Sequence, residues 1–173
     1  HVGMRNGNMA GKQVKLDQID LNIIKTLQQQ ARITNQALAD IVGLSPSPCL
    51  QRVRRLEELG VLTSYHAKVD VERICPRVSV IGTVTLRDHR HEDFESFEAA
   101  IAEIPEVVEC SKVSGSFDYL LRFECPSVSH YHELSDQLLA EGPGLIKISS
   151  HVVLSNTKEF KALPLDCLLI DQD

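Results

Sequence analysis

The stretch NQALADIVGLSPSPCLQRVRRLEELG, residues 35–60, contains the pattern of two short helices joined by a turn. Apolar residues recur at helical spacing over the first eight positions, a glycine interrupts them, and Ser45 is placed to begin a second helix. Pro46 and Pro48 then fall at its first and third positions, where an amide hydrogen would have no partner within the helix. The two prolines are therefore expected to start this helix and to fix its first turn.

The second of these helices has two unlike sides. Cys49, Val53 and Leu56 share one side, and the opposite side carries the polar and basic residues Ser47, Gln51, Arg54 and Arg55. Two helices with a three-residue turn are typical of the helix-turn-helix, whose second helix enters the major groove of DNA. Glutamine can read adenine, and arginine can read guanine or neutralise phosphate. Spacing alone also permits an ordinary solvated surface, with Arg54 pairing Glu58 one turn away.

The charge of the chain is divided between two unlike parts. The net charge of the 173 residues is −6, but residues 1–66 hold 8 Lys and Arg against 5 Asp and Glu, and residues 67–173 hold 10 against 19. A basic N-terminal head with net charge +3 thus precedes an acidic body with net charge −9. The basic part is the one that contains the candidate recognition helix.

Several function classes are disfavoured by the sequence. Apolar runs are too short for a membrane span, and five widely spaced cysteines without a CxxC motif fit buried thiols in a reducing cytoplasm. The pairs His89/His91 and His130/His132 are two residues apart, a spacing that diverges on a helix, and neither pair has a third ligand nearby. Phosphate-loop and nucleophile-elbow motifs are missing. We therefore expect no enzyme activity, no catalytic residue, no metal and no cofactor.

The acidic body alternates between strand and helix patterns. A strand is expected over residues 61–69, then a polar hinge, and then strand, helix, two strands joined by a two-residue turn at Gly115-Ser116, helix and strand. The last six are expected at residues 78–86, 94–104, 107–114, 117–125, 128–140 and 145–154. This β-α-β-β-α-β order is the ferredoxin-like pattern.

We accordingly expect an α+β protein with five segments along the chain. These are a disordered or cloning-derived segment at 1–14, a winged-helix-like helix-turn-helix domain at 15–64, a strand and hinge linker at 65–76, a ferredoxin-like domain at 77–156, and a C-terminal tail at 157–173. Helices cover one face of the sheet, and residues such as Ile81, Val108 and Leu120 or Leu121 would leave the other face apolar and wet. Pairing with a second subunit is expected to cover it. The apolar tail LPLDCLLID, residues 163–171, is expected to dock on a neighbouring subunit.

The runs LDQIDLNIIKTL (residues 16–27) and ARITNQALADIVGLSPSPCLQRVRRLEELGVLTSY (residues 31–65) resemble the DNA-binding domain of the Lrp/AsnC transcription regulators. The likeness continues to about Lys158 and departs from the family pattern at residues 28–31. It implies that the helix from Pro46 is the recognition helix and adds Pro48 and Arg52 to the positions that can face DNA. It further implies an effector-sensing domain that dimerises through its sheets and assembles into tetramers or octamers.

The same resemblance implies an amino acid pocket. The turn within VSGSFDYLL, residues 113–121, matches the family's Gly-x-x-Asp motif, which suggests as effector residues Gly115, Asp118, His151, Val152 and Val153. A carboxylate, turn amides and valines suit the ammonium, carboxylate and side chain of a free amino acid. The alternative is structural: Gly115 permits a positive φ and Asp118 braces the hairpin.

We therefore expect a cytoplasmic, sequence-specific DNA-binding transcriptional regulator whose DNA affinity or assembly responds to a small molecule, an amino acid by family resemblance. Two-fold symmetry would suit double-stranded DNA with palindromic or paired half-sites. Two alternatives stay open. One is an architectural protein that wraps DNA without a ligand, and the other is a small-molecule binding module with a vestigial head.

Overall fold

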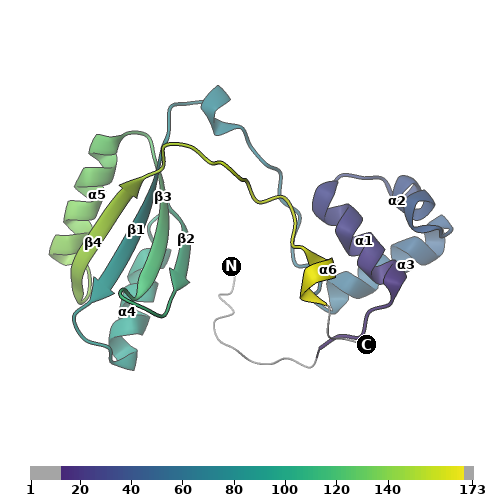
Figure 1. Cartoon of the computed structure of the whole chain (residues 1–173), viewed down its shortest axis with the longest axis horizontal. Coiled ribbons are helices and arrows are strands. Elements are labelled where there is room, and N and C mark those ends of the chain that lie inside the picture. Colours follow the sequence, from purple (N-terminus) through teal and green to yellow (C-terminus); the bar gives the residue numbers. More distant parts are fainter. Residues whose placement is uncertain (1–12, 170–173) are drawn as a thin grey trace. The chain divides into compact units, whose positions relative to one another are not determined.

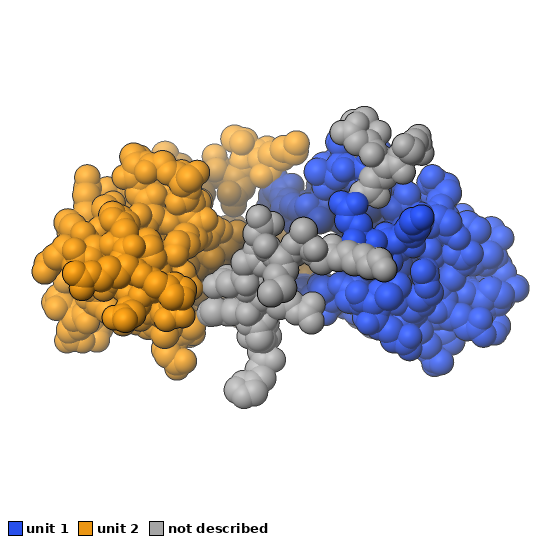
Figure 2. Space-filling view, turned by 90° about the horizontal axis from the view of Figure 1, so that it is seen from below, with its two compact units in different colours: residues 1–67, 159–173 blue, residues 68–158 orange. Residues whose placement is uncertain are grey.

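The computed structural model describes residues 13–169 and divides the chain into two compact units (Figures 1 and 2). One unit joins the chain up to Ala67 with the residues from Glu159 onward, and the other is Lys68–Lys158. The C-terminal segment thus belongs to the same unit as the N-terminal helices. The segment expected to be disordered, residues 1–14, lies almost wholly outside the described residues.

The first unit is built on α1 (Gln18–Gln29), α2 (Asn35–Val42) and α3 (Pro46–Glu58). Asp17 and Asp20 form a capping box at the start of α1, and the Thr34 hydroxyl accepts the Ala37 N–H at the start of α2. Gly43 ends α2 with φ of 72°, a left-handed conformation that favours glycine. The three helices enclose one apolar core, made of Ile23, Ile24, Leu27, Leu38, Ala39, Val42, Cys49 and Leu56.

α3 begins at Pro46, as the proline pattern predicts. Ser45 has the extended backbone of an N-cap, with φ of −77° and ψ of 157°, although its hydroxyl makes no capping hydrogen bond. Since Pro46 and Pro48 lack amide hydrogens, the first turn has few donors that need a cap. The Asn35 side-chain amide instead donates to the Pro46 carbonyl at 2.8 Å, which ties the starts of α2 and α3 together.

The prediction of a strand over residues 61–69 is wrong. Residues 63–70 have no regular structure, and the connection to the second unit contains only a short 3-10 helix, Val71–Arg73. Val69 and Ile74 are exposed. The alternation of apolar residues is not sufficient for a strand, because its N–H and C=O groups need a neighbouring strand, and the described chain offers none at this point.

The second unit has the ferredoxin-like fold that the sequence predicts. Its elements are β1 (Val78–Leu86), α4 (His91–Ala102), β2 (Val107–Lys112), β3 (Tyr119–Cys125), α5 (Val128–Glu141) and β4 (Leu145–Val152). The strands lie in the order β2-β3-β1-β4, every neighbouring pair is antiparallel, and α4 and α5 cover one face of the sheet (Figure 1). The core beneath the helices includes Val80, Val84, Phe97, Tyr119, Leu121, Phe123 and Tyr131.

The open face of the sheet is more polar than expected. Leu121 is buried beneath the helices, so of the two leucines only Leu120 reaches the open face, where it is 37 % exposed. Pairing places Ile81 opposite Arg122 and His151 on this face. The alternation of side chains assigns the same face to Thr83, Thr85, Glu124, Lys147 and Ser149. The surface is therefore a mixed one, in which Ile81 and Leu120 lie among polar and charged neighbours.

The β2–β3 connection is wider than the predicted two-residue turn. β2 ends at Lys112 and β3 begins at Tyr119, and the Val113 N–H donates to the Asp118 carbonyl at 2.9 Å across the connection. Gly115 has φ of 134° within this loop. The backbone of Asp118 also donates to the Val84 carbonyl at 2.8 Å, so the loop is held against β1 rather than closed as a tight hairpin.

Gly82 in β1 marks a close approach between the strand backbone and a core side chain. A Cβ at this position would lie 2.9 Å from Cε2 of Phe123, whose ring is fully buried and stacks edge-on against Tyr131. The sheet irregularity lies elsewhere, between Thr85 and Leu86. The aromatic core therefore uses the space that the missing side chain leaves.

Gly82→Ala is expected to destabilise the second unit, because the Phe123 ring has no room to move away from the added methyl. Overpacking of a core costs about 1–3 kcal/mol, and chemical denaturation of the full chain measures that loss. Thr83→Val, one residue away on the open face, is the control and should change the unfolding free energy by less than about 0.5 kcal/mol. Equal effects of the two substitutions would contradict the close-packing argument.

Candidate nucleic-acid interface and effector site

The outward side of α3 carries most of the residues predicted to contact DNA. Ser47, Pro48, Gln51, Arg54 and Arg55 are exposed, whereas Cys49 and Leu56 on the opposite side are buried in the core of the head. The helical spacing therefore separates a packed side from a solvent-facing side as predicted. The exposed side presents an amide, a hydroxyl and two guanidinium groups to solvent.

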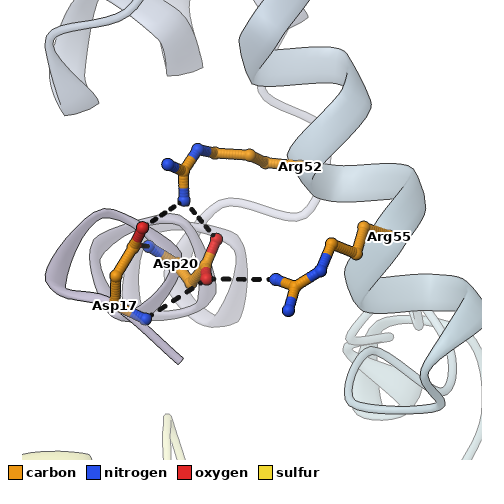
Figure 3. Close-up of polar contacts among 4 residues, drawn as sticks. All are labelled: Asp17, Asp20, Arg52 and Arg55. Carbon is orange, nitrogen blue, oxygen red and sulfur yellow. Dashed lines mark hydrogen bonds and ion pairs between the residues drawn. The ribbon is translucent and has the colours of Figure 1, made fainter. Parts of the chain in front are cut away.

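Arg52 lies at the boundary and is held by two carboxylates of α1 (Figure 3). Its Nη1 atom lies 2.7 Å from Oδ2 of Asp17 and 2.8 Å from Oδ1 of Asp20. Arg55 makes a longer contact of 3.3 Å from its Nη1 to Oδ2 of Asp20. Asp20 is only 2 % exposed, so its charge is compensated by these two arginines. We call Asp17, Asp20, Arg52 and Arg55 the α1–α3 clamp.

Protonation of the clamp reflects these contacts. The Asp20 backbone amide and the Arg52 guanidinium hold the pKa of Asp17 below its ordinary value. Asp17 and Asp20 in turn raise the pKa of Arg52. The Asp17 carboxylate and the Arg52 guanidinium are thus both held in their charged forms at neutral pH. The carboxylates also cap α1, so the same two residues set the start of α1 and the position of α3.

A shallow depression of about 630 Å³ borders the clamp. It is lined by residues from α1, from the segment before it and from α3, namely Lys15, Leu16, Asp17, Asp20, Pro48, Gln51, Arg52 and Arg55. Four of the six residues predicted to contact DNA therefore line one concave surface. Within the described residues Arg54 forms no ion pair, which leaves its guanidinium available to a phosphate.

The carboxylate of Asp118 is already engaged within its own chain. Its Oδ2 accepts the Leu86 N–H at 2.8 Å, and its Oδ1 lies 3.1 Å from Nε2 of His89. The side chain is 18 % exposed. The side chain thus braces the end of β1 and the residues after it, and the remaining lone pairs of the carboxylate still permit an additional donor.

The structure separates the predicted effector residues into two groups. His151 and Val152 pair with Ile81 and Val80 at the start of β1, whereas Asp118 contacts Val84 and Leu86 at its end. Four to five strand residues at about 3.3 Å each separate the two groups by roughly 15 Å. Gly115 is exposed in the loop before Asp118, and Val153 follows β4 with its N–H bonded to the Ser79 carbonyl. A single chain therefore does not gather all five residues around one small ligand.

Metal ligands, membrane spans and thiols are the other chemistries that the sequence raises. They contain no group of three or more His, Cys, Asp or Glu side chains arranged to hold a metal ion, and no helix among them is long and apolar enough to cross a membrane. Cys49 and Cys125 are buried, and burial raises the pKa of both thiols. Cys75, Cys110 and Cys167 are exposed, which departs from the expectation of buried thiols.

Sequence reasoning missed Asp17 and Asp20 as partners of the recognition helix. Asp17 is the N-cap of α1, a local feature, whereas its contact with Arg52 joins residues 35 positions apart. Local spacing carries no signal for such a pair. The presence of two acidic residues at the start of one helix and several arginines on another is the only hint, and it does not say which arginine is bound.

Each of the two units resembles a domain of known proteins. The profile of the Lrp/AsnC ligand binding domain matches residues 79–163, and that of a winged helix-turn-helix DNA-binding domain matches residues 16–63. The leucine-responsive regulatory protein of Salmonella typhimurium is 40% identical over 148 residues, which cover 86% of this chain and 90% of that protein. The transcriptional regulatory protein DoeX of Halomonas elongata is 38% identical over 145 residues, 84% of this chain and 92% of that protein.

Solved structures show the same arrangement of elements. A transcriptional regulator from Neisseria meningitidis, solved as a complex with L-Met, superposes with a TM-score of 0.84 at 32% identity, covering 90% of this chain and 100% of that one. The sequence relatives are transcriptional regulators, and their similarity extends over both the head and the sheet domain. The chain therefore belongs to the Lrp/AsnC family of transcriptional regulators, with a helix-turn-helix DNA-binding domain followed by a ligand-binding domain.

Proposed function

We propose that this regulator reads paired DNA half-sites with the exposed side of α3 and that an amino acid changes its DNA affinity or its assembly. The observation that carries the DNA part is the solvent-facing row of Ser47, Gln51, Arg54 and Arg55 on a helix whose other side is fixed in the core. The effector part is supported by the L-Met complex of the Neisseria relative. Function as a transcriptional regulator follows from the family.

The contacts of the clamp suggest that the three arginines of α3 have different roles. Arg52 satisfies two carboxylates and positions the helix, so its contribution to DNA contact is indirect. Arg54 is free to neutralise phosphate, and Gln51 has an amide suited to a base edge. Arg55 is half-exposed and makes one long contact with Asp20, which leaves donors available to DNA. Ser47 and Pro48 lie at the N-terminal end of α3, where recognition helices contact bases.

Gln51→Ala is expected to weaken binding to a cognate operator by about 1–3 kcal/mol and to leave binding to random duplex unchanged, because it removes a base contact. Arg54→Ala should weaken both and lower the slope of log K against log salt by about 0.9, the share of one phosphate contact. A cognate fragment is first selected from genomic DNA with the wild-type protein, and fluorescence anisotropy at several salt concentrations then measures both effects.

The control for the arginine is Arg87→Ala, an exposed arginine of the ligand-binding domain, which should leave both affinity and salt slope at wild-type values. If Gln51→Ala and Arg54→Ala bind cognate and random duplexes as the wild type does, α3 is not the DNA-reading element. Failure of the wild type to bind any duplex even at low salt would leave a small-molecule binding module with a vestigial head.

Asp20→Ala is expected to destabilise the head by about 2–4 kcal/mol, somewhat less than a fully buried ion pair, because both arginines reach water. The change also removes half of the capping box of α1. The helical circular-dichroism signal, followed during urea denaturation, measures this loss of unfolding free energy. Asp40→Ala, an exposed carboxylate of α2, is the matched control and should cost less than about 0.5 kcal/mol. Equal stability of the Asp20 variant and the wild type would show that the clamp does not hold α3.

The effector pocket is proposed to need more than one subunit. The two groups of candidate residues, Gly115 with Asp118 and His151 with Val152 and Val153, lie at opposite ends of β1 in one chain. In a two-fold dimer whose sheets face each other with antiparallel strands, the start of β1 in one chain lies near the end of β1 in the other. One chain can then supply the first group of residues and its partner the second. Ile81 and Leu120, on the open face of the sheet, would supply apolar area for sheet-to-sheet contact in a homodimer.

Dimers of this kind would present two recognition helices to DNA. A two-fold axis requires palindromic or paired half-sites about one helical turn apart, or a multiple of it. Further assembly into tetramers or octamers and a cytoplasmic location belong to the same proposal. An architectural protein that wraps DNA would share the head and the assembly, and would differ in having no response to a ligand.

Asp118→Asn tests the effector site without removing the side chain. The amide oxygen still accepts the Leu86 N–H, but the negative charge that would bind an ammonium group is lost. Calorimetric titration with the twenty amino acids should find one or more that bind the wild type and that bind this variant at least tenfold more weakly. DNA affinity without effector should stay within about twofold.

Asp88→Asn, a nearby exposed carboxylate, serves as the control and should bind the same amino acid as tightly as the wild type. Unchanged affinity in the Asp118 variant would leave that residue with a bracing role alone. If no amino acid binds the wild type or alters its DNA affinity, the architectural alternative replaces the regulated one.

A further inference from the structure

The C-terminal segment docks on α1 of the same chain. Leu165, in the short helix α6 (Leu165–Leu168), packs against the apolar core of the head. The Leu163 N–H donates to Oε1 of Gln28 at 2.7 Å, and the Lys25 ammonium lies 2.5 Å from a carboxylate oxygen of Asp166. Figure 1 shows α6 beside the helices of the head. The apolar tail expected to dock on a neighbouring subunit thus finds a partner within its own chain.

These contacts are few and weak enough to be reversible. Asp166 is 82 % exposed, so water screens its attraction to Lys25. Leu165 is only partly buried. The Gln28 Nε2 atom is buried without a hydrogen-bond partner among the described residues, which opposes the docked state. Among the described residues, the segment is held by a hydrogen bond, an exposed ion pair and a partly buried leucine, a set of contacts suited to repeated release.

The docked segment is joined by a short length of chain to the end of β4. His151, Val152 and Val153 are the effector candidates at that end, and Leu163 makes its contact with α1 ten residues after Val153. Ten residues span at most about 33–36 Å when fully extended. The head is therefore connected to the ligand-binding domain twice, once through residues 65–77 and once through this non-covalent contact.

We propose that residues 163–168 form a releasable clasp on α1 that couples the effector site to the DNA-binding head. The clasp limits the range of positions that the head can take, and ligand contacts at the end of β4 change the probability that it is closed. This inference rests on the proposed function, because it assigns the regulation of the same site. A ligand shifts the clasp only if it binds the closed and open forms unequally.

Thermodynamic linkage provides a test of the coupling that is the same whether the effector opens or closes the clasp. If an effector changes the closed-to-open ratio by some factor, then closing the clasp changes effector affinity by that same factor. Loss of the clasp must therefore alter effector affinity and abolish the part of the DNA response that passes through it. Neither effect is expected if the segment only covers an apolar patch.

The existence of the clasp is tested without any effector, by hydrogen–deuterium exchange on the full chain. Leu165→Asp places a charge against the apolar core and should speed exchange in residues 163–168 and in the last turn of α1 by about tenfold or more. Leu168→Asp, a matched change at a leucine that is 61 % exposed, should exchange as the wild type does. Wild-type exchange in the Leu165 variant would overturn the clasp.

A charge reversal covers the case in which Leu165→Asp fails to fold. Lys25→Asp and Asp166→Lys should each speed exchange in the same two peptides, and the double variant should restore protection. Coupling requires the closed and open forms to differ in DNA affinity, so each single variant should also shift DNA affinity in the absence of effector, and the double variant should return it toward the wild-type value. Identical exchange in the single and double variants would show that the ion pair does not close the clasp.

Coupling is then measured with an amino acid that binds the wild type and changes its DNA affinity. Leu165→Asp should reduce that change at least fivefold and shift effector affinity, while Leu168→Asp should do neither. If both variants respond as the wild type does, the clasp exists without coupling and the proposal is wrong. If no amino acid acts on the wild type, the effector proposal fails and coupling fails with it, while the exchange comparison still decides whether the segment docks.

Discussion

The position of α3 in the head depends on one buried carboxylate. Asp20 is almost fully removed from solvent, and a charge in that position requires compensation, which Arg52 and Arg55 provide from α3. Asp17 accepts from the same Arg52 and caps the helix on which both acids lie. The ion pairs therefore fix the distance and rotation of α3 relative to α1, in a way that apolar contacts, which are less directional, do not.

This constraint changes what the arginines of α3 mean for function. A count of basic residues treats Arg52, Arg54 and Arg55 alike, and three cations on one helix indicate a strong electrostatic footprint for DNA. The contacts show instead a gradient, in which Arg52 is bound to two acids, Arg55 to one at longer range, and Arg54 to none in the described chain. The charge available to phosphate is lower than the composition suggests, and the rigidity of the surface that carries it is higher.

Local sequence signals predicted the elements well because they depend on neighbours in the chain. The prolines at the start of α3 and the glycine that ends α2 are short-range features. The alternation of apolar residues in the strands of the sheet domain and their helical spacing in α4 and α5 are short-range features as well. The same reasoning failed where a distant partner decides the outcome. The strand expected at residues 61–69 lacks a neighbour, and the β2–β3 connection is widened because the backbone of Asp118 bonds to β1. Asp118 itself was identified by resemblance, but its contacts with Leu86 and His89 come from another strand and its following loop.

The C-terminal segment illustrates the same limit at the level of whole domains. Its composition indicated a docking sequence, since exposed leucines at the end of a chain are costly to leave in water, but composition does not select the surface. Gln28 and Lys25 are ordinary polar residues of α1 and are separated from their partners by more than 130 positions. Their contacts place Leu163 and Asp166 in the same compact unit as α1. A regulator built in this way has its ligand-binding domain inserted between two parts of its DNA-binding unit, so both ends of the inserted domain are joined covalently to that unit.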